Sequence, residues 1–352
     1  MKSPPRPTWC KDDDIVLTFD VAREHAGMRL DRFVQNRIPR LSRTRATRVV
    51  RNCAFHASGK PRRPSERVRA GEVVLIVRPA LDEPKVPLHF DVLHEDAHVL
   101  AIDKAPGLPM HPTATYYRNT LSFLLQSRYP ERTPQFAHRL DRETSGLVVC
   151  GWTTQAEVAL KTAFEKRRVK KRYVAIVEGR MNADEGEIDA PLGNVQQGLH
   201  IMMEVREGAL PSKTRYEVLE RSQSATLVQL HPHTGRQHQL RVHLAHIGHP
   251  IVGDKLYGPR GSKAFIDYME GERSDALLKA LGHPRHALHA QALRIAHPNG
   301  SGDADYEAPI PWDMARLWEA RRQGGEPVRF EALDAHYDAL GSTLDLAPDD
   351  PT

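Results

Sequence analysis

The sequence predicts an α+β protein with two folding units: a small α/β module near the N-terminus, and a larger domain in which helices flank a mixed, mainly antiparallel sheet. Three observations lead to this prediction. In the larger part, strand-like segments are separated by occasional helices, without a regular βαβ rhythm. The N-terminal part instead combines two helical segments with one short sheet. Between them, PALDEPKVP at 79–87 has the proline content of a linker.

The domain boundaries follow from composition. We divide the chain into a disordered tail at 1–14, the small module at 15–80, a linker at 81–89, the large domain at 90–322 and an acidic tail at 323–352. The acidic tail is assigned by charge, because residues 326–352 hold 7 acidic residues and 1 basic residue. Such a composition is typical of a solvated segment. A short helix around Phe330 to Leu340 could still dock on the large domain.

The small module begins with two amphipathic helices. Apolar residues recur at helical spacing from Leu30 to Ile38, and Pro39 ends this first pattern. Ser42 is suited to cap the second helix, LSRTRATRVVRNC. One side of that helix is apolar, and the other side carries Arg43, Arg45, Arg48 and Arg51. A turn that ends at Lys60 then leads to the strand-like GEVVLIV at 71–77.

The charge of the chain is divided unequally between its parts. Residues 21–80 contain 15 Lys and Arg against 4 Asp and Glu, a net charge of +11, whereas the rest of the chain carries −6. A compact basic block on a mildly acidic body is the pattern expected of a protein that neutralises nucleic-acid phosphates. A well-solvated surface is the alternative explanation of the same charge.

The large domain shows distinct strand and helix patterns. Strands are expected at VLAID (99–103), KRYVAIVEG (171–179), TRYEVLER (214–221), ATLVQL (225–230) and HALHAQALRI (286–295). Helices are expected at TQAEVALKTAFEKR (154–167), with Thr154 and Glu157 as a capping box, and at RQHQLRVHLAHIG (236–248), which Gly248 ends. A polar, partly helical insertion at 262–285 precedes the last strand.

Several protein classes do not fit this sequence. It has no uninterrupted run of about 18 apolar residues, so no membrane span is expected. Cys10, Cys53 and Cys150 lack CxxC spacing and predict neither a disulfide framework nor a cysteine zinc site. We therefore expect a cytoplasmic protein, and we expect it to be a monomer.

Five histidines between His233 and His249 raise the question of a metal centre. The last three are spaced by three residues, but no carboxylate motif such as HExxH accompanies them. Capping or RNA-facing roles suit these rings better. We predict no metal site, and a histidine-ligated metallohydrolase is the alternative.

Asp141 is the candidate functional carboxylate. An isolated aspartate in HRLDRETSG would most often pair with Arg139 or Arg142 and hold a turn. Here it precedes the apolar GLVVCGW, so it enters a buried strand, where a carboxylate needs a compensating cation. Arg241 could supply that cation in a bidentate geometry. Tyr173 opens another buried strand and offers an amphipathic ring for stacking or proton transfer.

Taken together, the motifs resemble a known enzyme family. HRLDRETSGL, KRYVAIV, TGRQHQLRVHLAHIGHPIVGDKLYG, LHAQAL and IDKAPGLPMHP resemble, in order and spacing, the RluA-type pseudouridine synthases from about residue 90 to 315. RLDRF, LSRTRATRVVRN, SGK and VRAGEVV resemble the S-four-like RNA-binding module. Three positions differ from the family pattern: Gln237 stands where threonine is common, Leu240 where isoleucine is common, and Ala105 where proline is usual. The small module also has AFHASGK where a V-x-V-N-G strand is usual.

The resemblance implies an RNA isomerase that needs no cofactor. Asp141 would act on the ribose as nucleophile or as partner to an elimination that gives a glycal, Arg241 would pair with it, and Tyr173 would stack on the uracil and serve as base. Arg139 and His138 would take part in base flipping, although an Arg139–Glu143 salt bridge is the alternative. The module residues expected to contact RNA are Arg43, Arg45, Arg48, Arg51 and Lys60.

The resemblance favours ribosomal RNA of the large subunit as substrate, with transfer RNA as the second possibility. Structured RNA is expected because double-helical RNA is recognised mainly through its shape and phosphates. A catalytically silent RNA-binding or ribosome-assembly factor is the alternative from a different functional class.

Overall fold

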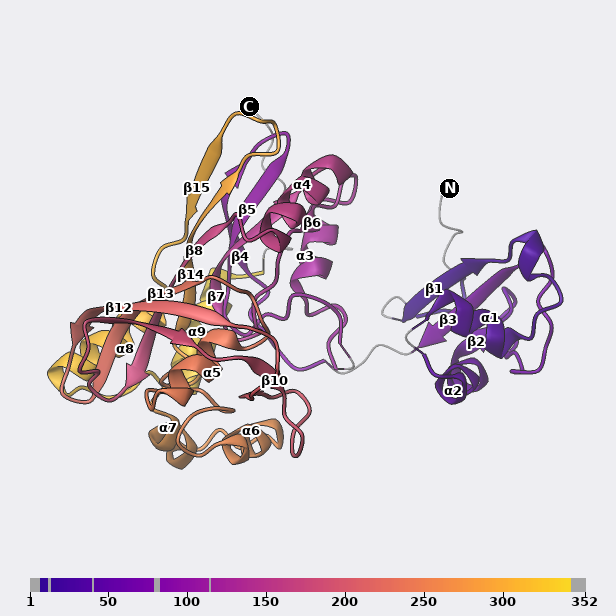
Figure 1. Ribbon diagram of the computed structural model, residues 1–352. Coiled ribbons are helices and arrows are strands. Elements are labelled where there is room, and N and C mark those ends of the chain that lie inside the picture. Colours follow the sequence, from indigo (N-terminus) through magenta and orange to yellow (C-terminus); the bar gives the residue numbers. More distant parts are fainter. Residues whose placement is uncertain (1–6, 12–13, 40, 79–82, 114, 343–352) are drawn as a thin grey trace. The chain divides into compact units, whose positions relative to one another are not determined.

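The computed structural model describes residues 7–11, 14–39, 41–78, 83–113 and 115–342 (Figure 1). The chain separates into two compact units, residues 1–82 and 83–352. Each unit has its own hydrophobic core, so each is described by itself.

The smaller unit packs two helices on a three-stranded antiparallel sheet of order β1-β3-β2. Its core contains Phe33 and Val50 from the two helices and Ile76 from the sheet. The predicted cap of the second helix is present, because the Ser42 side chain accepts the backbone N–H of Arg45. Its elements are β1 (Ile15–Asp20), η1 (Arg23–His25), α1 (Leu30–Arg37), α2 (Arg43–Cys53), β2 (Ala54–Phe55) and β3 (Val73–Arg78).

The predicted disordered tail, 1–14, is wrong at Trp9. The Trp9 indole N–H donates to the Ala57 carbonyl oxygen at 3.0 Å, and its ring lies 5.0 Å from the Phe55 ring, centre to centre. This bond and the ring contact hold Trp9 against the smaller unit, although 36% of the residue is exposed. Residues 1–6, 12 and 13 of the predicted tail lie outside the described residues.

The larger unit is built on a ten-stranded mixed sheet of order β4-β5-β7-β14-β8-β13-β12-β9, with β15 paired to β14 and β6 to β7. Among the described strands of this sheet, only β7 and β14 pair in parallel, which confirms the predicted mixed, mainly antiparallel α+β fold. The strands are β4 (Phe90–Glu95), β5 (Val99–Lys104), β6 (Gln135–Phe136), β7 (Ser145–Gly151), β8 (Lys170–Glu178), β9 (Glu185–Asp189), β12 (Lys213–Arg221), β13 (Ala225–Pro232), β14 (Leu288–Ala296) and β15 (Asp303–Glu307). A separate ribbon joins β10 (Leu192–Asn194) to β11 (Met203–Val205).

The helices of the larger unit include both predicted ones. The Thr154–Glu157 capping box is wrong by one residue: Thr153, which has extended backbone angles, accepts the Ala156 N–H at 3.1 Å. An extended backbone is what a cap residue requires. The helices are α3 (Leu121–Arg128), α4 (Thr154–Glu165), α5 (Gln239–His246), α6 (Ser262–Met269), α7 (Asp275–Leu281), α8 (Trp312–Gln323) and α9 (Phe330–Leu340).

The predicted acidic tail, 323–352, is wrong over α9, where the docked helix that we kept as an alternative is present. Phe330 is buried, and it packs against Leu277 and Leu281 of α7. The apolar face of α9 thus outweighs its acidic composition. Residues 343–352 of the predicted tail lie outside the described residues.

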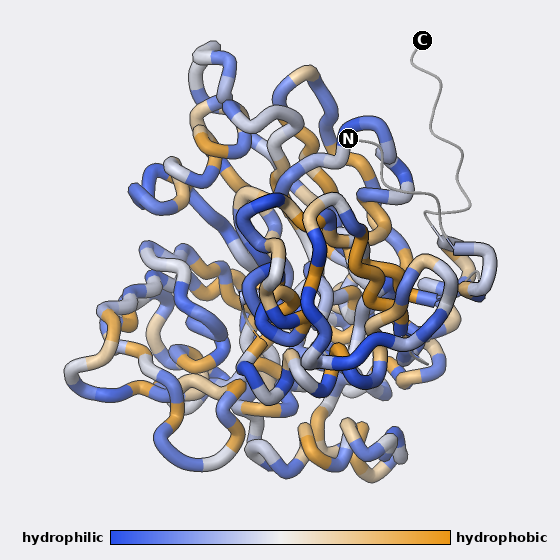
Figure 2. Tube along the Cα trace, turned by 90° about the vertical axis from the view of Figure 1, so that its right-hand side faces the viewer, coloured by the Kyte–Doolittle hydropathy of each residue, from blue (hydrophilic) through white to orange (hydrophobic). Residues whose placement is uncertain are grey.

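Different helices cover the two faces of the sheet. Successive residues of a strand point to opposite faces. Accordingly, Tyr173 of β8 faces the side where α5 packs, and Val174 and Ile176 face α8. Hydrophobic and hydrophilic stretches alternate along the chain in both units (Figure 2). The α5 face carries the predicted site residues.

Candidate active site

Asp141 lies in the loop that leads into β7, where its carbonyl accepts the Thr144 N–H at 3.1 Å. Its carboxylate is partly accessible, with 24% of the side chain exposed. Arg241, one hundred residues later on α5, donates from Nη1 to Asp141 Oδ2 at 2.9 Å. The structure thus brings together two charged residues that the sequence only suggested as partners.

Arg241 is bidentate to a different carboxylate from the one we predicted. It donates from Nε and Nη2 to the two oxygens of Asp254, at 2.7 and 2.9 Å, and makes a single bond to Asp141. Burial opposes the guanidinium charge, but Asp254 and Asp141 outweigh it and raise the pKa of Arg241 further. The arginine therefore stays charged and is fixed in one orientation, with one N–H directed at Asp141.

Asp254 is the main site residue that sequence reasoning missed. Its side chain is fully buried, and Oδ1 also accepts the backbone N–H groups of Leu256 and Tyr257. Burial works against its charge, yet Arg241 and these bonds hold the pKa of Asp254 well below its usual range. The available signal was its place in HPIVGDKLYG, a motif already noted for its resemblance.

The TSG segment anchors the Asp141 loop to the neighbouring strand. Thr144 hydrogen-bonds His286 at 2.8 Å and Ser145 hydrogen-bonds His289 at 3.0 Å. Gly146 has φ +108°, and a Cβ there would collide with the backbone of Ala290. The close approach of β7 and β14 therefore requires glycine.

Glu143 pairs with Lys255 and not with Arg139. Its carboxylate accepts from Lys255 Nζ at 2.9 Å and lies 3.5 Å from Arg142 Nη2. Burial raises the pKa of Glu143, but the two cations outweigh that effect and lower it to about 2. The Arg139–Glu143 salt bridge that we weighed is therefore wrong.

Tyr173 lines a small cavity beside Asp141. The cavity has a volume of about 170 Å³, and Leu240, Lys171 and Arg139 also line it. Burial, with a smaller contribution from Asp141, raises the pKa of the Tyr173 phenol far above its ordinary value. Tyr173 is therefore protonated in the free protein, which suits a stacking ring better than a phenolate base.

A larger cavity adjoins the first one. It has a volume of about 630 Å³, and it shares Asp141, Arg139 and His238 with the small cavity. Phe265 and Met269 of α6 lie along it, so the 262–285 insertion contributes to the walls of the site. Asp141 thus lines both the small and the larger cavity.

Arg139 and His138 differ in placement. Arg139 is exposed, lines both cavities, and among the described residues has no carboxylate within ion-pair distance. His138 lines neither cavity: its Nε2 accepts the Val149 N–H at 3.1 Å, and its ring stacks on Phe164. Burial lowers the pKa of His138 to about 3, so it is neutral. This geometry fits loop fixation, and it does not favour the base-flipping role predicted for His138.

Two histidines of the 233–258 segment, His243 and His249, bond other parts of the protein rather than one another. His243 bonds Thr214 and the Ala190 carbonyl, and His249 bonds the Glu178 carbonyl. In the described part of the chain, the His/Asp group whose ligand atoms approach one another is His94, Asp96 and His297. There the Asn299 N–H donates to His297 Nδ1, so Nε2 carries the proton and donates to Asp96 at 2.8 Å. That contact is a hydrogen bond, and it occupies the nitrogen that a metal would need.

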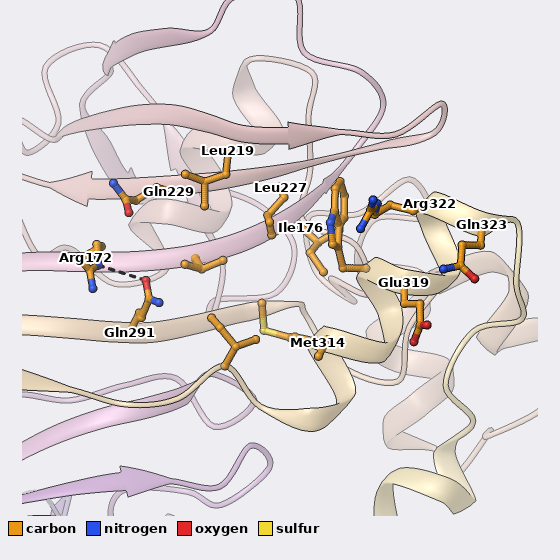
Figure 3. A pocket seen from close by; sticks show the side chains of 14 residues that line it. Arg172, Ile176, Leu219, Leu227, Gln229, Gln291, Met314, Glu319, Arg322 and Gln323 are labelled. Atoms are coloured by element: carbon orange, nitrogen blue, oxygen red, sulfur yellow. Dashed lines mark hydrogen bonds between the residues drawn. The ribbon is translucent and has the colours of Figure 1, made fainter.

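A third cavity, of about 560 Å³, lies on the α8 face of the sheet. In Figure 3, Leu219 and Leu227 from the sheet and Met314 from α8 surround it, and the Arg172–Gln291 hydrogen bond lies at one end. Because Arg172 and Tyr173 are successive strand residues, this cavity is on the opposite face from Asp141. It is therefore separate from the candidate active site.

The smaller unit carries the predicted RNA-facing residues. The apolar side of α2 is buried through Ala46 and Val50, while the basic residues Arg43, Arg45, Arg48, Arg51 and Lys60 are all exposed. Within the described ranges, no helix is long and apolar enough to cross a membrane.

Comparisons with known proteins agree with this site. A family model described as RNA pseudouridylate synthase matches residues 98–246, a range that includes Asp141, Tyr173 and Arg241. The chain is 32% identical over 323 residues to ribosomal large subunit pseudouridine synthase D of Nitrosomonas europaea, covering 89% of this chain and 90% of the relative. It is 35% identical over 307 residues to the protein of that name from Xanthomonas campestris pv. campestris, covering 85% and 90%.

A solved structure shares both fold and sequence with this chain. The human RNA pseudouridylate synthase domain containing 4 matches with a TM-score of 0.53 and 25% identity, over 66% of this chain and 93% of that one. The extent of the sequence matches, together with the Asp141 site, shows the family. The chain belongs to the RluA-type family of RNA pseudouridine synthases, which isomerise uridine in RNA.

Proposed function

We propose that this enzyme modifies uridines of large-subunit ribosomal RNA, with Asp141 as the essential carboxylate. The observation that carries the proposal is the Asp254–Arg241–Asp141 chain, which holds a partly accessible carboxylate in the wall of a small pocket. The relatives from Nitrosomonas europaea and Xanthomonas campestris pv. campestris are named for the large ribosomal subunit, which supports this substrate over transfer RNA.

The two cavities suit a flipped nucleotide. The small pocket, about 170 Å³, is smaller than the roughly 300–1,000 Å³ typical of drug-sized ligands, which suits a single base. The larger cavity would hold the adjoining ribose and backbone. Arg139 is exposed between them without a carboxylate partner among the described residues, so it is free to support the vacated position in the RNA.

The reaction breaks the bond from ribose C1′ to uracil N1 and joins C1′ to C5; the C5 proton leaves to solvent and N1 takes up a proton, so the product is an isomer of uridine. Asp141 acts on the ribose, either as nucleophile at C1′ or as partner to an elimination. Arg241 orients that carboxylate through Nη1, because its other N–H groups are held by Asp254. Tyr173 stacks on the uracil as a neutral phenol. A role as base would require an ionisation that its burial opposes.

The smaller unit binds the structured RNA around the target. Its exposed arginines, Arg43, Arg45, Arg48 and Arg51, lie along the solvent side of α2, where they can contact phosphates of both strands. We further propose that the enzyme is a monomer and acts in the cytoplasm.

Carbodiimide mapping of pseudouridine in cells with and without the gene tests the substrate. The proposal expects loss of modification at one or a few positions of large-subunit ribosomal RNA. Loss confined to transfer RNA would overturn the ribosomal assignment. Unchanged modification everywhere would favour the silent assembly factor.

A further inference from the structure

His238 occupies a strained position at the entrance of the site. It is the residue before α5 and has φ +54° and ψ +14°, a left-handed conformation that side-chain-bearing residues rarely adopt. Its side chain is only 11% exposed, and it lines both cavities. Backbone strain of this kind persists where the surrounding structure fixes a side chain in place.

A relay of hydrogen bonds determines which nitrogen of His238 carries the proton. The Met203 backbone N–H donates to the Tyr257 hydroxyl oxygen at 2.8 Å. The Tyr257 hydroxyl then donates its own proton to His238 Nδ1, also at 2.8 Å. We assign the tautomer in which Nδ1 accepts, because it gives the Tyr257 proton an acceptor, and Nε2 then carries the N–H. Burial lowers the pKa of His238 to about 4, so the ring is neutral at physiological pH.

The Nε2–H group faces the Asp141 carboxylate across a gap. Nε2 lies 3.8 Å from Asp141 Oδ2, which is too long for a hydrogen bond. A single oxygen placed about 2.8 Å from both atoms would bridge them. That oxygen must accept from His238 and donate to Asp141; among the oxygens of a nucleotide only a hydroxyl does both, and a water molecule is the alternative bridge that a 2′-deoxy substrate tests. Phosphate and uracil carbonyl oxygens cannot donate.

An internal RNA nucleotide offers one free hydroxyl, because its 3′ and 5′ oxygens are esterified. We propose that His238 binds the 2′-hydroxyl of the target uridine and shares it with Asp141. This inference rests on the proposed function of Asp141 at the ribose. It gives the site a direct means of distinguishing RNA from DNA, and it places C1′, the neighbouring carbon, beside the carboxylate.

A cycle that combines protein and substrate changes tests this contact. The substrates are the same RNA fragment with uridine or 2′-deoxyuridine at the target position. The proteins are the wild type, His238→Ala, His238→Gln and Tyr257→Phe. His246→Ala, on the exposed side of the same helix, is the matched control. Tritium release from C5 under single-turnover conditions and RNA affinity are measured for each pair.

In the wild type, removal of the 2′-hydroxyl is expected to slow the reaction, and about tenfold of that loss would come from the His238 bond. The ratio of the rates with uridine and 2′-deoxyuridine is the 2′-deoxy penalty. In His238→Ala this penalty should be about tenfold smaller than in the wild type. The intrinsic effect of the hydroxyl on the reaction is the same in both proteins, so it cancels when the two penalties are compared. His238→Gln, which keeps a donor at a similar reach, should restore part of the penalty. Tyr257→Phe should weaken it, and His246→Ala should match the wild type.

An equal 2′-deoxy penalty in wild type and His238→Ala would overturn the inference, even if the variant is slower overall. A loss of activity that accompanies a lower melting temperature, with an unchanged penalty, would show a structural role and would also overturn it. Failure of the proposed function is a different result: the wild type would release no tritium from any RNA.

Discussion

Replacing Asp254 with asparagine tests the charge chain behind Asp141. The substitution preserves the size of the side chain but removes the negative charge that Arg241 contacts twice, at 2.7 and 2.9 Å. Asparagine also presents an NH2 group where one carboxylate oxygen accepted from the guanidinium. Arg241 is then a buried cation that keeps one neutral acceptor at position 254 and its bond to Asp141, so it loses one hydrogen bond and the charge of Asp254.

The expected cost is large because both partners are buried. Breaking a buried ion pair by removing one partner costs about 3–5 kcal/mol. For a domain of this size, each kcal/mol corresponds to about 2–4 °C, so Asp254→Asn should lower the melting temperature by roughly 6–20 °C. Activity should fall as well, because Arg241 is no longer held at the angle that directs Nη1 to Asp141.

The effect should depend on pH in a defined direction. Because the pKa of Asp254 is depressed in the folded protein, its stabilisation is complete above the ordinary carboxyl pKa of about 4. It is lost as the pH falls through the lower folded value. The difference between wild type and Asp254→Asn should therefore be constant near neutrality and shrink in acid.

Thermal melts followed by tryptophan fluorescence measure this effect, and Asp305→Asn is the control. Asp305 pairs with Arg294 in an exposed ion pair on the β14–β15 hairpin, and its loss should leave the melting temperature nearly unchanged. If Asp254→Asn melted within a degree or two of Asp305→Asn, the buried charge chain would not contribute as argued.

Three further outcomes follow from the same contacts. Gly146→Ala should yield little soluble protein, measured by expression and gel filtration, because its Cβ would collide with the Ala290 backbone at φ +108°; normal yield would contradict the need for glycine. Replacing Arg45 and Arg48 together with alanine should weaken RNA binding. The slope of log Kd against log salt concentration should fall by about one for each phosphate contact that is lost. An unchanged slope would show that these arginines do not contact RNA phosphates. Tyr173→Phe should keep RNA affinity within about threefold, since stacking needs only the ring, and a larger loss would assign binding to the hydroxyl.

Much of the fold could be predicted because its signals are local. The helical spacing of apolar residues in α1 and the Ser42 cap can both be recognised within a few residues of sequence. The apolar patterns of β12 and β13 likewise predict strands before their pairing is known. Thr153 and Thr154 have the same side chain, so sequence alone could not choose between two adjacent caps. Backbone angles decide it.

Candidate site residues could be predicted where a charged side chain stands in a motif rich in functional groups. Asp141 and Arg241 fit that description. Asp254 does not, since its role is to hold Arg241, and that need exists only once the segment after α5 folds back against it. His138 was grouped with Arg139 because they are adjacent, but the two side chains point to different surroundings, which a loop sequence does not reveal.

The position of Trp9 could not be predicted because the surrounding sequence has no local pattern. A single aromatic residue among prolines and charged residues gives no periodic pattern, so the sequence of this segment predicts a tail. Its ring packs on Phe55 because the turn around Gly59, at φ +84°, brings the chain beneath it. The Trp9–Ala57 hydrogen bond joins two segments that are 48 residues apart, and no local rule predicts it.

The most direct test of the central claim is tritium release from C5-labelled uridine in ribosomal RNA by the wild type and Asp141→Asn. The wild type should release tritium, and the variant should release none while it binds the RNA with similar affinity and keeps its melting temperature. Release by Asp141→Asn at a rate comparable to that of the wild type would contradict the assignment of Asp141 as the carboxylate that acts on the ribose.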